Sequence, residues 1–181
     1  METLNEKLYG NIIVFADDSE DHYKMVSKAL TACFNGGKQT TALKWVRNGE
    51  ELVHYLLTTD HYKSPEMADH PAIIVLDIQM PKMNGLEVLE KIKVNPLLNY
   101  IPIICMSNYY SNLEINMCYK FGVNSFIKKP VNFDEILVLV KFIHDYWFKV
   151  NILPRSDRAD VSQADELQAP KENKRAPAQI P

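Results

Sequence analysis

The segment AIIVLDIQMPKMNG, residues 72–85, joins five consecutive apolar residues to an aspartate and then to a turn that ends in Asn84-Gly85. A short apolar run bounded by turn residues is typical of a strand that is buried on both faces of a sheet. The segment therefore predicts a strand over Ala72–Leu76, with Asp77 at its carboxyl end.

Three other segments repeat this arrangement of an apolar run followed by polar residues. They are Ile12–Phe15, which leads through Ala16 to Asp17 and Asp18; Ile101–Met106, which is followed by Ser107; and Ser125–Ile127, which is followed by Lys128, Lys129 and Pro130. In open α/β sheets, ligands bind at the carboxyl ends of the strands. We therefore expect three carboxylates, a hydroxyl and an ammonium group to meet at one small site.

Segments with helical apolar spacing separate these strands, and Thr41–Val46 predicts a fifth strand. The first expected helix follows Asp18 and Ser19, either of which can cap it. The other four are expected over Gly49–Leu57, after Gly85, around Leu113–Phe121, and over Asp134–Val150. Right-handed crossovers place helices on both faces of a parallel sheet. The alternation therefore predicts an α/β fold with a doubly wound, five-stranded parallel sheet.

Composition divides the chain into three parts. Residues 1–10 form a short N-terminal lead, and residues 11–154 hold all the predicted strands and helices. Residues 155–181 contain no aromatic side chain and are rich in alanine, proline, glutamine and charged residues. Such a segment buries too little apolar surface to offset its ordering entropy, so we expect a disordered tail and no second folded domain there.

Charge and composition disfavour several classes of function. The net charge of −3 and the pI near 6.0 give no reason to expect nucleic acid as a partner. No apolar run approaches the roughly 18 residues of a membrane span, and Met1–Lys7 lacks a hydrophobic signal core, so we expect a cytoplasmic protein. Cys33, Cys105 and Cys118 are far apart and are interpreted as thiols rather than metal ligands or disulfide partners.

The histidines lack the close spacing of a metal site. They are His22, His54, His61, His70 and His144. His22 is near the expected site in sequence, but we interpret it as a surface residue of the first helix.

The polar residues at the strand ends fit phosphoryl transfer to a carboxylate. Asp17 and Asp18 would bind a hard cation such as Mg²⁺, which prefers oxygen ligands, and Asp77 would attack phosphorus to give an acyl phosphate. Lys129 would neutralise a phosphoryl oxygen, and Ser107 would donate its hydroxyl to the same group. Each residue also has an ordinary alternative role: helix capping for Asp18 and Ser107, loop capping for Asp77, and a solvated loop position for Lys129.

Four stretches together carry a family resemblance: Ala16-Asp17-Asp18, Leu76–Gly85, Pro102–Ser107 and Lys129-Pro130. Over about Asn11–Pro154 the chain resembles the receiver domain of two-component response regulators. The resemblance implies a flavodoxin-like fold of five βα units. It also implies that Asp77 accepts a phosphoryl group from a phosphohistidine on a sensor histidine kinase or a histidine phosphotransfer protein.

The resemblance further assigns roles within the site. It implies Mg²⁺ held by Asp17, Asp18, Asp77 and the backbone carbonyl of Gln79, and a cis peptide bond before Pro130. It also implies a switch in which Ser107 moves toward the phosphoryl group and Phe126 follows. That movement would repack the face formed by the fourth helix, the fifth strand and the fifth helix.

Several residues set this chain apart from the usual pattern of that family. Phe126 lacks the hydroxyl of the tyrosine that most relatives carry, and Asn108 replaces a small residue. Tyr109 and Gln79 occupy the positions that tune access of water to the aspartyl phosphate. We expect Tyr109 to cover the site in part and to slow self-dephosphorylation.

The last predicted helix carries more apolar residues than one buried face can hold. Ile136, Leu139, Val140, Ile143 and Trp147 can face the sheet, which leaves Phe142, Tyr146 and others on another side. Contiguous exposed apolar surface marks an interface, unless Thr58–Pro71 or the segment after Val150 covers it. The long loop before the third strand and the ending Tyr146–Pro154 resemble the small regulators that partner bacterial phytochromes, in which a similar ending helps to form a homodimer. We expect an isologous dimer through the fourth and fifth helices that buries Phe142, Tyr146 and Trp147.

Three functional classes are consistent with these patterns to different degrees. The first is a stand-alone phosphoacceptor switch, which is a signalling module and an enzyme only toward its own phosphorylation and dephosphorylation. The kinase that serves it need not be a phytochrome. The second is a phosphorylation-independent adaptor with the same fold. The third is a metal-dependent phosphatase, which commonly needs a second acid two residues after the nucleophile, where this chain has Gln79.

Overall fold

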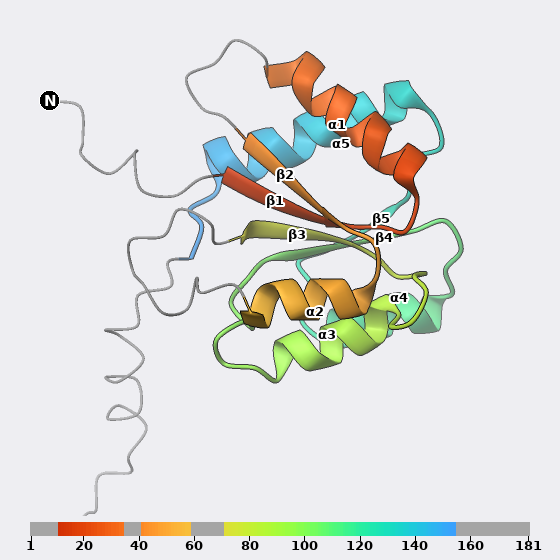
Figure 1. Ribbon diagram of the computed structural model, residues 1–181, viewed down its shortest axis with the longest axis vertical. Coiled ribbons are helices and arrows are strands. Elements are labelled where there is room, and N and C mark those ends of the chain that lie inside the picture. Colours follow the sequence, from red (N-terminus) through yellow and green to blue (C-terminus); the bar gives the residue numbers. More distant parts are fainter. Residues whose placement is uncertain (1–10, 35–40, 59–70, 155–181) are drawn as a thin grey trace, which may run out of the picture.

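The computed structural model describes residues 11–34, 41–58 and 71–154. The expected lead over 1–10, most of the loop before the third strand and the expected tail over 155–181 lie outside the described residues. Within the described part, strands and helices alternate along the chain (Figure 1).

The strands are β1 (Asn11–Ala16), β2 (Thr41–Val46), β3 (Pro71–Asp77), β4 (Ile103–Ser107) and β5 (Ser125–Lys128). The helices are α1 (Glu20–Phe34), α2 (Gly49–Thr58), α3 (Gly85–Lys93), α4 (Asn112–Lys120), α5 (Phe133–Asp145) and a π-helical turn, η2 (Tyr146–Val150).

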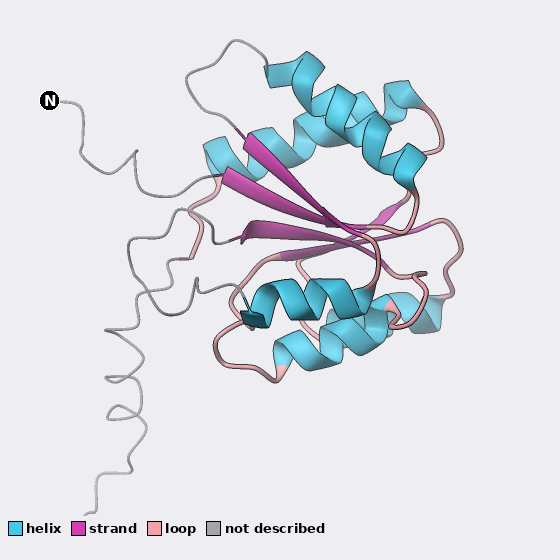
Figure 2. Cartoon of the chain, in the orientation of Figure 1, coloured by secondary structure: helices cyan, strands magenta, loops and turns pink. Residues whose placement is uncertain are grey.

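All five strands belong to one parallel sheet with the order β2-β1-β3-β4-β5. The order reverses between β1 and β3, because β2 lies on one side of β1 and the later strands lie on the other. Figure 2 shows the loops that leave the carboxyl ends of the strands gathered along one edge. This confirms the predicted fold class, and it places the ends of β1 and β3 at the topological switch point where such folds bind ligands.

Helices cover both faces of the sheet: α1 and α5 lie on one face, and α2, α3 and α4 lie on the other (Figure 1). On β3, Ile73 and Val75 pack in the core beneath α1 and α5, whereas Ile74 and Leu76 pack in the opposite core. Successive side chains of a strand point to opposite faces. A strand with a helical layer on both sides therefore needs a continuous apolar run, as the sequence of β3 has.

Most elements match the predicted bounds to within one residue, and two differ by more. The fourth strand begins at Ile103 rather than at Ile101, because Pro102 has no N–H to donate and only its carbonyl is bonded, to the amide of Ile74 at 2.9 Å. The last helix is α-helical only to Asp145. Its final turn closes with a bond from the amide of Asn151 to the carbonyl of Tyr146 at 2.8 Å, which is the five-residue spacing of a π-helix.

The start of α1 resolves the choice of cap. The hydroxyl of Ser19 accepts a hydrogen bond from the amide of His22 at 3.2 Å, so Ser19 caps the helix and Asp18 does not. The side chain of Asp18 is exposed and remains available for another role. Of the described helices, none combines the length and the apolar character that crossing a bilayer would require.

Candidate functional site

Asp17 follows β1 and is completely buried. Its Oδ1 accepts a hydrogen bond from the amide of Ser19 at 2.9 Å. Its Oδ2 contacts Lys129 Nζ at 2.8 Å and His22 Nδ1 at 2.5 Å. Burial raises the pKa of this carboxyl, but the hydrogen bonds from His22 and Lys129 outweigh burial and hold the pKa below its ordinary value. Asp17 is therefore a fixed, ionised carboxylate.

The backbone around Asp17 is anchored to the neighbouring strand. Its amide donates to the carbonyl of Val46 at 3.1 Å, and its carbonyl accepts from Trp45 Nε1 at 2.7 Å. The indole of Trp45 in turn stacks on the ring of Tyr23 in α1. These contacts place the first carboxylate rigidly at the edge of the sheet.

Asp77 ends β3, next to the end of β1, because Leu76 pairs with Ala16 in the parallel register. Its Oδ2 accepts from Lys129 Nζ at 2.7 Å, and its Oδ1 accepts from the amide of Gln79 at 2.9 Å. Burial raises the pKa of Asp77, and the hydrogen bond and charge of Lys129 offset this only in part.

The loop after Asp77 depends on a glycine. A Cβ on Gly85 would lie 2.7 Å from the Cα of Ile78 and 2.8 Å from the carbonyl oxygen of Asp77. The amide of Gly85 donates to the carbonyl of Ile78 at 2.9 Å, which closes the loop. Only glycine permits this approach, so the Asn84-Gly85 turn fixes the position of the phosphoacceptor candidate as well as the start of α3.

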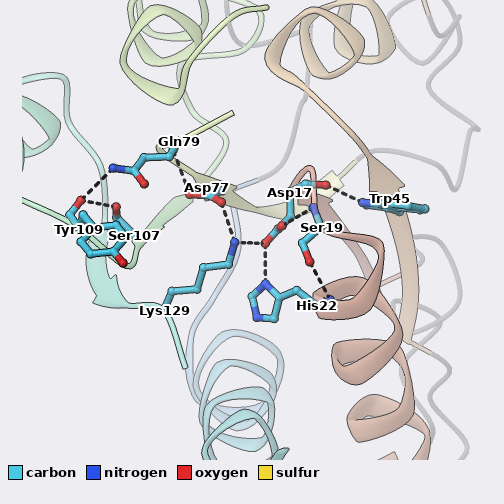
Figure 3. Close-up of polar contacts among 9 residues, drawn as sticks. All are labelled: Asp17, Ser19, His22, Trp45, Asp77, Gln79, Ser107, Tyr109 and Lys129. Carbon is cyan, nitrogen blue, oxygen red and sulfur yellow. Dashed lines mark hydrogen bonds and ion pairs between the residues drawn. The ribbon is translucent and has the colours of Figure 1, made fainter. Parts of the chain in front are cut away.

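Lys129 links the two buried carboxylates (Figure 3). Its amide donates to the carbonyl of Ser107 at 3.0 Å, which directs the side chain back toward the end of β3. Burial lowers the pKa of Lys129, but the hydrogen bonds to Asp17 and Asp77 outweigh burial and raise the pKa overall. The inward position agrees with the prediction. The cis bond before Pro130 is not found, because no described peptide bond is cis.

The residues suit a hard divalent cation. Asp17, Asp18 and Asp77 each offer a carboxylate oxygen, and these oxygens lie within 4.8 Å of one another. Oxygen donors at this spacing match the preference of Mg²⁺ or Mn²⁺. Asp18 is exposed while the other two are buried, so the site opens to solvent on the side of Asp18.

Ser107 is buried at the end of β4, but its hydroxyl does not point to Asp77. It donates to the carbonyl of Tyr109 at 2.6 Å, and the side-chain amide of Gln79 donates to the same carbonyl at 3.4 Å (Figure 3). Tyr109 as a whole is 76% exposed. The carbonyl rather than the ring of Tyr109 therefore makes the contacts on this side of the site.

Phe126 of β5 is half-buried and packs against the core beneath α4. Its ring contacts the ring of Tyr110 edge-on, with centroids 5.6 Å apart. Tyr110 was not predicted as part of the site, although it follows Tyr109 directly. The contact joins the predicted switch residue on β5 to the loop that follows Ser107.

His22 contradicts the interpretation made from the sequence. It is 4% exposed, not a surface residue, and it contacts a carboxylate of the site. Helical spacing could have revealed its position, since it precedes Val26, Ala29 and Leu30 on the buried face of α1 at intervals of four, seven and eight residues.

The apolar residues of the last helical segment separate into two groups. Phe142 and Tyr146 are 74% and 51% exposed and border a groove between β5 and α5. Trp147 is 8% exposed and packs in the core beneath α1 and α5. Of the three residues expected at a dimer surface, Trp147 is thus already enclosed within the single chain.

The reversed strand order and the Asp17–Lys129–Asp77 cluster define a receiver-like α/β domain. Comparison with known proteins agrees. The model of the response regulator receiver domain family matches residues 13–141. The chain belongs to this family.

Similarity extends over most of the length of individual regulators. The chain is 27% identical over 146 residues to the response regulator Rcp1 of Synechocystis sp., covering 79% of this chain and 92% of Rcp1. It is 27% identical over 143 residues to the probable methanogenesis regulatory protein FilR2 of Methanothrix harundinacea, covering 79% of this chain and 87% of FilR2.

Solved structures show the same similarity. The phosphorylated cyanobacterial phytochrome response regulator RcpA superposes with a TM-score of 0.69 at 29% identity, covering 80% of this chain and 98% of RcpA. The Mn²⁺-bound form of Rcp1 superposes with a TM-score of 0.67 at 26% identity, covering 80% of this chain and 99% of Rcp1. The chain is thus a response regulator receiver whose relatives include single-domain phytochrome regulators, and the adaptor alternative is not favoured.

Proposed function

We propose that the chain is a stand-alone phosphoacceptor switch in which Asp77 receives a phosphoryl group from a phosphohistidine. The donor would be a sensor histidine kinase, of the phytochrome type or another, or a histidine phosphotransfer protein. The observation that carries this proposal is the buried Asp17–Lys129–Asp77 cluster at the switch point of the sheet. A cluster of this kind is costly to bury and is most useful where charge develops during a reaction.

The geometry suggests how the residues share the work. A carboxylate oxygen of Asp77 forms the new bond to phosphorus as the bond from phosphorus to the histidine nitrogen breaks, which gives an acyl phosphate. Lys129 already contacts Asp77 Oδ2 and needs only a small movement to pair with a phosphoryl oxygen. A divalent cation held by Asp17, Asp18, Asp77 and the carbonyl of Gln79 would neutralise phosphoryl charge when bound.

The switch follows from the current partner of Ser107. Its hydroxyl donates to the carbonyl of Tyr109, so a phosphoryl group on Asp77 offers it a competing and stronger, charged acceptor. Turning toward that group would release the Tyr109 carbonyl and allow the loop to move. The edge contact between Tyr110 and Phe126 would carry this movement to β5 and the surface beside α5.

We also propose that this surface mediates signalling through a second copy of the chain. Phe142 and Tyr146 are exposed apolar residues on adjacent turns, next to the face that the switch would repack. An isologous dimer would bury the same patch on both copies. We further propose a cytoplasmic location, which the amino-acid composition of the chain supports.

The test uses acetyl phosphate as the phosphodonor with Mg²⁺, read by intact mass. We expect the parent to gain one phosphoryl group and Asp77→Asn to gain none. A chelator should abolish the gain in the parent. Phosphorylation of Asp77→Asn to the same extent as the parent would refute the assignment of the phosphoacceptor.

If acetyl phosphate leaves the parent unmodified, the experiment is repeated with a phosphorylated histidine kinase as donor. An unmodified parent in both experiments, together with undetectable binding of Mg²⁺, would favour a phosphorylation-independent role.

A further inference from the structure

His22 contacts Asp17, and the proposed mechanism has so far given this contact no role. It lies in the first turn of α1, and its ring turns inward, away from solvent, toward Asp17 (Figure 3). Nδ1 lies 2.5 Å from Asp17 Oδ2. Because an ionised carboxylate can only accept, Nδ1 carries the proton and donates.

The rest of the ring lies in apolar surroundings. Its edge contacts the ring of Phe15, with centroids 5.3 Å apart, and Nε2 is buried with no hydrogen-bond partner among the described residues. Burying a polar atom without a partner is unfavourable, and an apolar side chain would avoid that penalty. The bond to Asp17 is therefore the feature that distinguishes histidine from an apolar residue at this position.

The second donor to Asp17 Oδ2 has a competing task. Lys129 contacts Asp17 and Asp77 at once, and it would turn toward a phosphoryl group on Asp77. Among the described residues, no hydrogen bond or ion pair joins His22 to Asp77, and the His22 ring is held by α1 and by the ring of Phe15. It is thus the side-chain donor that can keep Asp17 in place while Lys129 moves.

We propose that His22 is a positioning residue whose Nδ1–H holds the Asp17 carboxylate in the orientation that serves a bound divalent cation. This inference rests on the proposed function, because it assumes that the carboxylate cluster binds a cation. In this arrangement His22 does not touch the cation; it orients a carboxylate, and the carboxylate faces the cation. Loss of a residue that hydrogen-bonds to a metal ligand typically lowers metal affinity by about 10- to 100-fold.

The experiment measures binding of Mg²⁺ alone and of Mn²⁺ alone to the full chain by titration calorimetry, without a phosphodonor. His22→Phe keeps the ring and its contact with Phe15 but removes the donor. We expect its affinity for both cations to fall by about 10-fold or more. Thermal unfolding in chelator confirms that each variant is folded before its affinity is compared.

Two polar variants of His22 test whether the position of the hydrogen-bond donor matters, rather than the packing of the ring. The amide nitrogen of His22→Asn can occupy the place of Nδ1, whereas that of His22→Gln reaches the place of Nε2. We expect His22→Asn to retain most of the affinity and His22→Gln to lose it. The comparison of His22→Asn with His22→Gln also tests the role of His22 if His22→Phe does not fold.

His144 provides the control for burial of a histidine. It is 3% exposed on α5, stacks on Phe34 and lies 3.4 Å from Asp145 Oδ1, in the same helical layer as His22. Among the described residues it has no hydrogen bond or ion pair with Asp17, Asp18 or Asp77. His144→Phe should leave cation affinity unchanged. In a chain that already carries Asp17→Asn, adding His22→Phe should cause no further loss.

The possible failures are distinguishable. If the parent itself binds neither cation, both the metal site and the role of His22 are overturned. If the parent binds and His22→Phe or His22→Gln binds equally well, the role of His22 alone is overturned. Equal losses in His22→Phe and His144→Phe would assign the effect to packing and would also overturn it.

Discussion

Lys129 shows how much of this site depends on one side chain. Its ammonium group contacts Asp17 and Asp77, and all three residues are buried. Removing one partner of a buried ion pair leaves an uncompensated charge, which destabilises a protein by about 3–5 kcal/mol.

We therefore expect Lys129→Met to lower the free energy of unfolding by about 3 kcal/mol in chelator. Added Mg²⁺ should restore part of the loss, because a cation can replace the missing positive charge. Urea unfolding with and without Mg²⁺ measures both effects. Lys128→Met, at the exposed neighbouring position, should change little. Equal stability of Lys129→Met and the parent in chelator would contradict the geometry.

The two buried aspartates should respond to pH with opposite signs. The pKa of Asp77 is raised by burial, so the folded protein binds this proton more tightly than the unfolded chain does. Its stabilising contribution is complete below the ordinary value of 3.8 and is lost as the pH rises through the raised pKa. The pKa of Asp17 is lowered, so its contribution is present at neutral pH and is lost on acidification through the lowered pKa.

Asp77→Asn cannot ionise, and we expect it to be more stable than the parent at pH 7 in chelator. The difference should shrink as the pH falls toward 3.8. Urea unfolding across this range measures it. Asp21→Asn makes the same chemical change at an exposed position and serves as the control. A less stable Asp77→Asn at pH 7 would show that Lys129 dominates over burial at this carboxyl.

The loop between β4 and α4 is the element that we propose responds to the state of Asp77. Its Tyr109 carbonyl accepts from both Ser107 and Gln79, while the Tyr109 ring is exposed beside them. The helix that follows begins with a capping box, in which the side chain of Ser111 accepts from the amide of Glu114 and Glu114 reaches back to the amide of Ser111. The loop is thus fixed at its helical end by the capping box, and at Tyr109 by two hydrogen bonds that a reoriented Ser107 would weaken.

We expect Tyr109→Ala to shorten the half-life of the phosphorylated protein, because the ring then no longer restricts access of water to the acyl phosphate. The rate of loss of the phosphoryl group after removal of the donor measures this. Tyr119→Ala, an exposed tyrosine at the far end of α4, is the control. A half-life longer than that of the parent would contradict the expected role of Tyr109.

At the scale of the whole molecule, the exposed apolar patch on α5 and η2 predicts self-association. We expect the parent to form a dimer in light scattering, and Phe142→Asp to be monomeric at the same concentration, because a charge in the core of an interface opposes its burial. Val94→Asp is the matched control. Val94 is 76% exposed, close to the 74% of Phe142, but it lies at the end of α3 on the opposite face of the sheet. A parent that stays monomeric at high concentration, with and without a phosphoryl mimic, would refute the dimer.

The sequence alone determined the architecture and most of the cluster. Apolar runs of strand length, alternating with helical spacing, specify a parallel sheet covered on both faces, because only doubly buried strands are apolar throughout. Asp17, Asp77, Ser107 and Lys129 were predictable because each lies within two residues of the end of a predicted strand, and parallel strands bring their carboxyl ends together.

Tertiary structure decided what no local pattern could specify. It turned His22 inward to Asp17, bonded Ser107 to the carbonyl of Tyr109, joined Tyr110 to Phe126, and enclosed Trp147 while leaving Phe142 exposed. Each of these contacts depends on where two separate segments lie relative to each other, and helical or strand periodicity fixes only which side of one segment is buried. Composition and spacing thus specify the fold, whereas the orientation of individual side chains follows from packing between elements.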